Sequence, residues 1–334
     1  MASLEPSSAS PGPVAAGTPP LALGPPSNAR SYRQIGYVFA AVGALLFSTK
    51  AIAIKLVYGG TVDAVTLLAL RMGLSVPIYL VIGALAVRDR KTRGTALPDA
   101  ATVLKAAAIG ALGYWIASYF DFLGLEYISA QFERLILFTY PLFVVIFGAL
   151  FFHQPMKLRT LPAIGVSYLG LALIFTANLV ATGANVAVGA GLVLISALAF
   201  ALYQLFAREA IVGMGPRLFT CIAMSGAAVA VFAQFAVTRP VAAELAAVSP
   251  RVWVISLYLA IGATVLPSFF LNAALHRISA QANATIGTLS PVMTIVLAVL
   301  ILGEPLTLAN IAGTVLVLAG VGWFTLADRR RTGS

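Results

Sequence analysis

Long apolar runs separated by short polar breaks are the feature that most limits how this chain can fold. A helix of about 20 apolar residues crosses the ~30 Å hydrocarbon core of a bilayer. Backbone amides in lipid must be satisfied within their own segment, so runs of this length predict helices rather than barrel strands. Such runs occupy residues 35–58, 62–87, 103–128, 130–152, 158–177, 187–210, 216–237, 251–275, 279–302 and 307–326. The sequence therefore predicts an all-α polytopic membrane protein with ten transmembrane helices.

The composition supports this prediction, since 60% of the residues are hydrophobic and only 10% are charged. Too few polar side chains are present to cover a soluble surface. The net charge of +10 could suggest a nucleic-acid partner. The basic residues, however, lie in short clusters at the ends of apolar runs, where membrane topology explains them. We therefore expect a lipid bilayer, and no nucleic acid, as the partner.

The two ends of the chain and its cysteine add further limits. Residues 1–34 are rich in Pro, Ser, Ala and Gly, which predicts a disordered tail. The first apolar run has full span length and no small-residue cleavage pattern after it, so we expect it to stay in the mature protein. Residues 329–334 form a basic tail. Cys221 is the single cysteine and lies inside an apolar run, so we expect no disulfide, no metal and no cofactor.

The second half of the chain repeats the first at a constant offset. Ile128-Ser129-Ala130-Gln131 recurs as Ile278-Ser279-Ala280-Gln281. Identical residues continue in this register at Ser118 and Ser268, Phe120 and Phe270, Leu125 and Leu275, Pro141 and Pro291, Pro155 and Pro305, and Gly170 and Gly320. The period is far longer than the roughly 20–50 residues of a solenoid repeat. We interpret the chain as a duplicated half-molecule, with one five-helix repeat at 35–180 and another at 181–328.

The basic residues predict how the spans are oriented. One side of the membrane would carry Arg30, Arg33, Arg88, Arg90, Lys91, Arg93, Lys157, Arg159, Arg208, Arg217, Arg277, Arg329, Arg330 and Arg331. The other side would carry chiefly Arg239 and Arg251. Cytoplasmic loops are the basic ones, so both termini are predicted to be cytoplasmic in a multi-pass protein of the cell inner membrane.

Five spans per repeat is an odd number, so the second repeat must enter the membrane in the opposite sense. Inverted repeats give a protein two nearly equivalent conformations, one open to each side of the membrane. This architecture predicts a transporter that works by alternating access. A duplicated scaffold, a channel and a receptor remain alternatives. An intramembrane hydrolase built on Ser167 with His153 or His276 is disfavoured, because no acidic residue stands at a meaningful spacing from either histidine.

Charged residues at membrane depth mark the candidate substrate site, because a charge at the bilayer centre costs at least about 2.5–3.5 kcal/mol. At ~1.5 Å per residue from the outer end of each span, Lys50 lies ~12 Å deep, Arg71 ~14 Å and Asp121 ~10 Å. These three could bind substrate, or could form an ion pair that only fixes helix packing. Glu133 and Arg134 lie shallower, at ~6 Å, and predict a structural pairing near the outer mouth, with Glu126 as a further partner.

The second half offers only neutral polar groups at the matching depth. These are Tyr203, Gln204, Gln234, Ser268, Asn272 and Asn283. Asp121 has Leu271 as its repeat mate. The two halves are thus expected to share a frame while the charged chemistry lies in the first.

Aromatic residues and helix breakers complete the candidate site. Trp115 and Tyr119 lie one turn apart on one helical face, and with Tyr140 they could line an apolar pocket. Pro141 and Pro291 interrupt the same backbone hydrogen bond in both halves and are hinge candidates. Several glycines of the fifth and tenth spans predict close helix packing, namely Gly165, Gly313, Gly320 and Gly322.

Three stretches resemble the EamA family of the drug/metabolite transporter superfamily. They are Gly113-Tyr114-Trp115-Ile116-Ala117-Ser118-Tyr119-Phe120-Asp121-Phe122-Leu123-Gly124-Leu125, Glu133-Arg134-Leu135-Ile136-Leu137-Phe138-Thr139-Tyr140-Pro141 and Gly303-Glu304-Pro305. The likeness covers nearly everything after residue 34. The first half departs from it at His153-Gln154-Pro155, where the second has Gly-Glu-Pro.

The resemblance implies export of small metabolites, best known for amino acids, through a central cavity between the halves. An amino acid would place its carboxylate on Lys50 or Arg71 and its ammonium on Asp121 or Asn272. Efflux of drugs or other hydrophobic molecules is the alternative, for which a cationic level is poorly suited. We expect a transporter rather than an enzyme, and a monomer as the functional unit.

Overall fold

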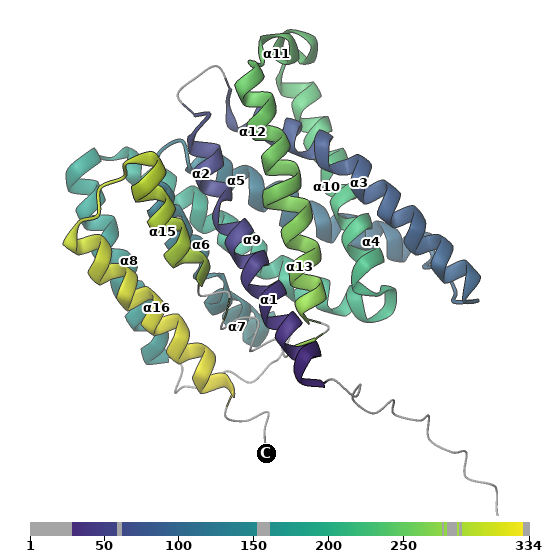
Figure 1. Cartoon of the computed structure of the whole chain (residues 1–334). Helices are drawn as coiled ribbons and strands as arrows, with labels where there is room; N and C mark the ends of the chain where they lie inside the picture. The colour runs from purple at the N-terminus through teal and green to yellow at the C-terminus, as the bar shows by residue number, and fades with distance from the viewer. Residues whose placement is uncertain are drawn as a thin grey trace, which may run out of the picture.

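The computed structural model describes residues 29–58, 62–151, 161–275, 277–278, 286 and 289–329, and it is all-helical, with no strand among them (Figure 1). In chain order the elements are α1 (Ala29–Ser48), α2 (Lys50–Lys55), α3 (Ala64–Thr92), α4 (Ala100–Gly110), the π-helix η1 (Ala111–Ile116), α5 (Ala117–Gly124), α6 (Ala130–Leu137), α7 (Tyr140–Phe151), α8 (Leu161–Thr182), α9 (Asn185–Met214), α10 (Pro216–Thr238), α11 (Val241–Ala247), α12 (Pro250–Ala260), the π-helix η3 (Ile261–Val265), α13 (Leu266–Leu275), α15 (Leu289–Leu302) and α16 (Leu308–Arg329).

Eight helical segments are long and apolar enough to cross a membrane, which supports a multi-pass membrane protein. They are Ser31–Lys55, Ala64–Thr92, Ala100–Gly124, Ala130–Phe151, Pro162–Val180, Asn185–Ala207, Pro216–Thr238 and Pro250–Phe270. Each coincides with one of the first eight predicted runs. At the ninth and tenth runs the described helices Leu289–Leu302 and Leu308–Trp323 are apolar but shorter. The start of the ninth run lies mostly outside the described residues.

The third and eighth spans have the same internal plan. Each begins as an α-helix, widens into a π-helix and returns to an α-helix. The π-helices begin at Ala111 and Ile261, which are repeat mates. π-Turns inside α-helices are rare and concentrate at functional sites. Their recurrence at matching positions shows that the repeat extends to backbone geometry.

Two other spans are interrupted where side chains bond to the backbone. The first span breaks between α1 and α2 at Thr49, whose Oγ1 donates to the Leu46 carbonyl at 2.6 Å. The fourth breaks between α6 and α7, where Thr139 Oγ1 donates to the Ile136 carbonyl at 2.6 Å. Pro141, two residues after Thr139, has no amide hydrogen to continue the helix. Both breaks adjoin charged or proline residues that the sequence singled out.

Glycines bring α8 and α16 into close contact, as Figure 1 shows for the two ribbons. A Cβ on Gly170 would lie 2.6 Å from the Gly313 carbonyl oxygen, and one on Gly320 would lie 2.6 Å from the Ala163 carbonyl oxygen. Residue 163 is the mate of 313, and 170 is the mate of 320. The two contacts therefore exchange when the halves are exchanged, and the helices run antiparallel.

The expectation for the other two glycines of these spans was wrong. A Cβ on Gly165 or Gly322 would meet nothing within 4 Å. Both residues point away from the helix pair, because close approach repeats only where the same helical face returns to the contact. Ser167 lies in the contact itself, and its hydroxyl donates to the carbonyls of Ala163 and Val317.

Helix packing also crosses between the halves. α1, from the first half, packs against α13 and α15 of the second, whereas α9, from the second, packs against α5 and α7 of the first. α3 and α10 lie together as the corresponding pair of second and seventh spans. The first and sixth spans are thus exchanged between the halves, so neither half encloses its own core.

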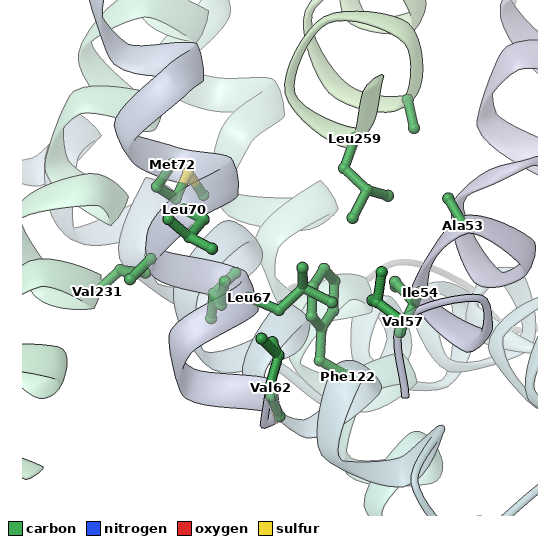
Figure 2. Packing of buried hydrophobic residues seen from close by; sticks show 14 of the residues in the cluster. Ala53, Ile54, Val57, Val62, Leu67, Leu70, Met72, Phe122, Val231 and Leu259 are labelled. Carbon is green, nitrogen blue, oxygen red and sulfur yellow. The ribbon is translucent and has the colours of Figure 1, made fainter. Parts of the chain in front are cut away.

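The largest apolar core lies around α3, where α2, α5, α10 and α12 meet. Figure 2 shows Leu67 of α3 near Phe122 and Met72 further along α3, with Val231 and Leu259 contributed by α10 and α12. All five side chains are buried. The core includes Phe122, which follows Asp121 in α5.

The two ends of the described bundle differ. α1 begins and α16 ends at one end, and α11 lies at the opposite end (Figure 1). Near α11 the halves are joined by an ion pair between Asp63 and Arg239, and by a hydrogen bond from Thr66 to Glu244.

Candidate functional site

Lys50 stands at the centre of a buried charged cluster. It is the first residue of α2, immediately after the break at Thr49, and its side chain is nearly excluded from solvent. Its Nζ donates to Asp121 Oδ2 at 2.5 Å and lies 3.7 Å from Glu133 Oε1. Lys50 belongs to the first span, whose α1 part packs on the second half, and Asp121 belongs to α5. The ion pair therefore links the first span back to the first half.

Glu133 and Arg134 belong to this same cluster, which corrects the expectation that they lie apart from it near the mouth. Both are buried, with exposures of 0% and 3%. Arg134 Nε lies 3.9 Å from Glu133 Oε2, and Arg134 Nη2 donates to the Phe47 carbonyl at 3.1 Å. Depth counted along one unbroken helix missed this, since α6 is a short helix that packs on α2 and turns Glu133 towards Lys50.

Glu126 has a different partner from the one expected. Its Oε1 accepts a hydrogen bond from the Ala64 amide at 3.1 Å, at the start of α3. Loss of solvation raises the pKa of the Glu126 carboxyl above its usual value, and the Ala64 bond partly offsets this. Glu126 lies in the connection after α5 and links it to the start of α3.

Arg71 of α3 supplies a third buried cation, with an exposure of 4%. Its guanidinium carbon lies 4.8 Å from the centre of the Phe122 ring, a cation–π distance. Nε and Nη2 of Arg71 are buried and have no hydrogen-bond partner within the described residues. Phe122 follows Asp121 in α5, and Arg71 interacts electrostatically with Asp121.

The cluster has a formal excess of one positive charge and several unused hydrogen-bonding atoms. Its members are three buried basic residues, Lys50, Arg71 and Arg134, and two buried acidic residues, Asp121 and Glu133. Asp121 Oδ1 and both Glu133 oxygens are buried without a hydrogen-bond partner among the residues described. Buried polar atoms are nearly always paired, so such a concentration calls for an explanation.

The three aromatic residues of the expected pocket have different neighbours. Trp115 and Tyr119 both pack against the core that contains Phe122, and Trp115 Nε1 donates to Gln234 Oε1 at 2.6 Å. Tyr140 instead meets the ring of Phe200 at a centroid distance of 5.0 Å. This contact arises because α7 packs on α9, and a pocket lined by all three residues stays a prediction.

Two of the predicted positions are only partly described. Asn272 lies in α13 and Pro141 in the first turn of α7, but both side chains lie outside the described part of the structure. Pro291 is described, and it is buried near the start of α15. The hinge assignment for both prolines stays a prediction.

Glu304 is a structural residue that the sequence analysis did not assign. Its carboxylate accepts hydrogen bonds from the amides of Ala130 at 2.7 Å and Gln131 at 3.2 Å. Ser129 Oγ accepts from the Phe132 amide at 3.2 Å, so the first amides of α6 are satisfied. The Gly-Glu-Pro signal was visible in the sequence, but which helix it would cap was not. The second half thereby holds the helix that carries Glu133.

The residues considered for a hydrolase or a metal site are described only in part. His153 and His276 lie outside the described residues, and Ser167 is bonded to backbone carbonyls. Across the described ranges, no group of three His, Cys, Asp or Glu side chains is placed to hold a metal ion.

Comparisons with known proteins identify a family and several similar transporters. The model of the EamA-like transporter family matches residues 34–176 and again 187–326. An uncharacterized transporter of Bacillus subtilis (strain 168), YcbK, is 28% identical over 293 residues, covering 83% of this chain and 88% of that protein. An uncharacterized transporter of Clostridium kluyveri is 24% identical over 292 residues, covering 85% and 91%. A solved crystal structure with 16% identity matches with a TM-score of 0.59 over 91% of this chain and 99% of that one, which shows a shared fold.

Proposed function

Because this chain belongs to the EamA-like transporter family, we propose that it exports small metabolites, and specifically amino acids, by alternating access. The transporter would lie in the cell inner membrane with both termini on the cytoplasmic side and would work as a monomer. Its ten spans would form two five-helix repeats, residues 35–180 and 181–328, around a central cavity. The N-terminal 34 residues and the basic residues 329–334 would be cytoplasmic tails.

The antiparallel contact between α8 and α16 supports an inverted relation between the repeats. Gly170 with Gly313 and Gly320 with Ala163 are one contact and its exchanged copy. Such an exchange corresponds to a two-fold axis perpendicular to the helices, which lies in the membrane plane if both helices span the bilayer. Inverted repeats of this kind underlie alternating access in many secondary transporters.

The charged cluster is the observation that carries the choice of cargo. Its formal excess of one positive charge attracts an anionic group, since electrostatic attraction is several times stronger here than in water. An amino acid supplies a carboxylate for Lys50 or Arg71 and an ammonium group for the carboxylates. The apolar surfaces of Trp115 and Tyr119 lie against the same core and would contact the side chain.

The alternative is efflux of drugs or other hydrophobic molecules. Many such molecules are cations, which the excess positive charge would repel. A channel and a receptor differ from a transporter in kinetics rather than in residues.

The experiment is a transport screen with purified protein in liposomes. We expect saturable exchange of radiolabelled amino acids, with acceleration when unlabelled amino acid is present on the far side. Flux that does not saturate would indicate a channel, and no flux would indicate a receptor. Transport restricted to cations without a carboxylate would replace amino-acid export with drug efflux.

A further inference from the structure

Not all five charged residues of the cluster are equally free to bind a ligand. Lys50 already donates to Asp121 at 2.5 Å and has Glu133 at 3.7 Å. A substrate carboxylate would have to compete with two protein carboxylates for this one ammonium group. Removing one partner of a buried ion pair is costly, because the other charge is left uncompensated. Lys50 and Asp121 are therefore better suited to hold the site together than to receive substrate.

Arg71 has the opposite character, since two nitrogens of its guanidinium have no hydrogen-bond partner within the described residues. The unpartnered atoms Nε and Nη2 lie next to each other along one edge of the planar guanidinium. This edge offers two parallel N–H groups, which is the arrangement that binds both oxygens of a carboxylate. The Phe122 ring holds the guanidinium at a cation–π distance of 4.8 Å, without using that edge for hydrogen bonds.

Glu133 is the complementary group. Its nearest cations, Lys50 at 3.7 Å and Arg134 at 3.9 Å, are too distant for good hydrogen bonds. Both of its oxygens are buried without a hydrogen-bond partner in the described part of the chain, and so is Asp121 Oδ1. Carboxyl oxygens accept hydrogen bonds, so these atoms can receive donors from a ligand. An ammonium group has three.

We propose that Arg71 and Glu133 are the two recognition residues for a zwitterionic substrate, with the Lys50–Asp121 ion pair as the scaffold between them. This inference rests on the proposed function and names the residues that select its cargo. Arg71 binds the substrate carboxylate through Nε and Nη2. The substrate ammonium group donates to Glu133 and to Asp121 Oδ1.

The arrangement selects for both charged groups at once. An amine without a carboxylate leaves the Arg71 edge unpaired and meets three protein cations. A carboxylate without an ammonium group leaves Glu133 unpaired. A site built to hydrogen-bond a substrate group rejects an analogue that lacks it far more strongly than a site that only loses apolar contact.

The test compares L-phenylalanine with phenylalaninamide, which lacks the carboxylate, and N-acetyl-phenylalanine, which lacks the ammonium group. L-Leucine, leucinamide and N-acetyl-leucine form a second set. Each compound competes for exchange of the radiolabelled amino acid in liposomes, and its binding to purified protein is measured separately by thermal stabilisation. Wild-type protein should prefer the amino acid to either analogue by on the order of 100-fold or more.

Arg71→Lys keeps the charge but removes the paired N–H edge, so it should still fold and should lose most of the preference for phenylalanine over its amide. Glu133→Gln keeps the size and should lose the preference over the N-acetyl compound. Each variant should largely keep the other preference. Arg90→Gln is the matched control on the same helix, because Arg90 binds the Met214 carbonyl far from the cluster and should leave both preferences unchanged.

Two negative results have different meanings. If wild-type protein exchanges amino acids selectively and both variants keep both preferences, the recognition pair is wrong while the proposed function stands. If wild-type protein exchanges no amino acid but carries other solutes, the proposed cargo is wrong, and the recognition pair fails with it.

Discussion

The two repeats share a frame and differ in chemistry. The π-helices begin at mates Ala111 and Ile261, and the contacts between α8 and α16 exchange with the halves. The charged residues have no such counterparts. At the mates of Asp121, Glu133 and Arg134 the second half has leucine, asparagine and alanine, at positions 271, 283 and 284. Symmetry is thus preserved where helices pack and lost where charges gather.

The physical reason is that helix packing must be similar in both halves, whereas a buried charge depends only on its near neighbours. A conformational cycle between two similar states needs both halves to pack alike, so helix contacts and breaks are constrained in pairs. A buried charge needs only nearby partners, and Lys50, Asp121 and Glu133 supply these within one cluster. One repeat can therefore hold the binding chemistry while both supply the moving frame.

The first prediction tests whether the two halves have opposite orientations in the membrane. In a Cys221→Ala background, Met156→Cys and Leu306→Cys place single cysteines at mate positions. An impermeant thiol reagent added to intact cells should label position 306 fully and position 156 only after permeabilisation. Labelling of both from outside, or of 156 alone, would contradict the inverted arrangement.

The second prediction transfers the chemistry of the second half to the first. Asp121→Leu installs the residue found at its mate and leaves Lys50 without its 2.5 Å partner. Breaking a buried ion pair in this way costs about 3–5 kcal/mol, so folded yield and transport should both collapse. Lys50→Met combined with Asp121→Leu should restore much of the free energy of unfolding in detergent.

The mate of Asp121 in the second half supplies a control for this prediction. Leu271→Asp is the reciprocal control, because it buries a carboxylate in the second half and should be destabilising alone. If Asp121→Leu unfolds no more easily than wild type, the ion pair does not support the fold, and the contrast between the halves has no energetic basis.

How far the sequence predicts this molecule depends on the kind of feature. Hydrophobic runs of span length placed the helices well, because the bilayer imposes one length and one type of backbone pairing. The repeat register likewise carried over to the π-helices at Ala111 and Ile261. Helix exchange between the halves was not predictable, since periodicity within one helix says nothing about which neighbour it meets.

The site shows the same limit. Lys50, Arg71 and Asp121 were identifiable because charge is rare in apolar runs and must be explained. Glu133 was misplaced because the break after α6 and its packing on α2 are tertiary features. Tyr140 was grouped with Trp115 because both are aromatic residues of consecutive spans, and the packing of α7 on α9, which brings Tyr140 against Phe200, was not predictable. Residue type revealed the chemistry, and only the packing revealed which groups meet.

The third prediction concerns the shared frame. Gly313→Ala would place a Cβ 2.3 Å from Ile174 and 2.7 Å from the Gly170 carbonyl, and Gly320→Ala would meet Ala163 as closely. Overpacking of this kind should cost about 1–3 kcal/mol in each variant. Gly165→Ala and Gly322→Ala face open space and should instead stabilise their helices, by up to about 1 kcal/mol. The free energy of unfolding in detergent should be compared across all four variants. If only one of Gly313→Ala and Gly320→Ala were destabilising, the symmetric frame would be contradicted.

The last prediction tests whether the paired prolines move the frame. A proline leaves the carbonyl four residues earlier without its helical partner, so the fourth span can bend at low cost at the break between α6 and α7, and the second half has the same opportunity at Pro291. Pro141→Ala and Pro291→Ala should each straighten and stiffen one helix, slowing turnover about fivefold, a change of about 1 kcal/mol in the barrier. Because the repeats are proposed to be inverted, the two variants should slow opposite half-cycles, which export and uptake rates measured separately in oriented liposomes would separate. Substrate binding and folded yield should stay near wild type, since neither proline touches the charged cluster in the proposed mechanism. If both half-cycles keep their rates in both variants, the prolines are packing residues and the movement must arise at another shared element, with the π-helices as the remaining matched pair.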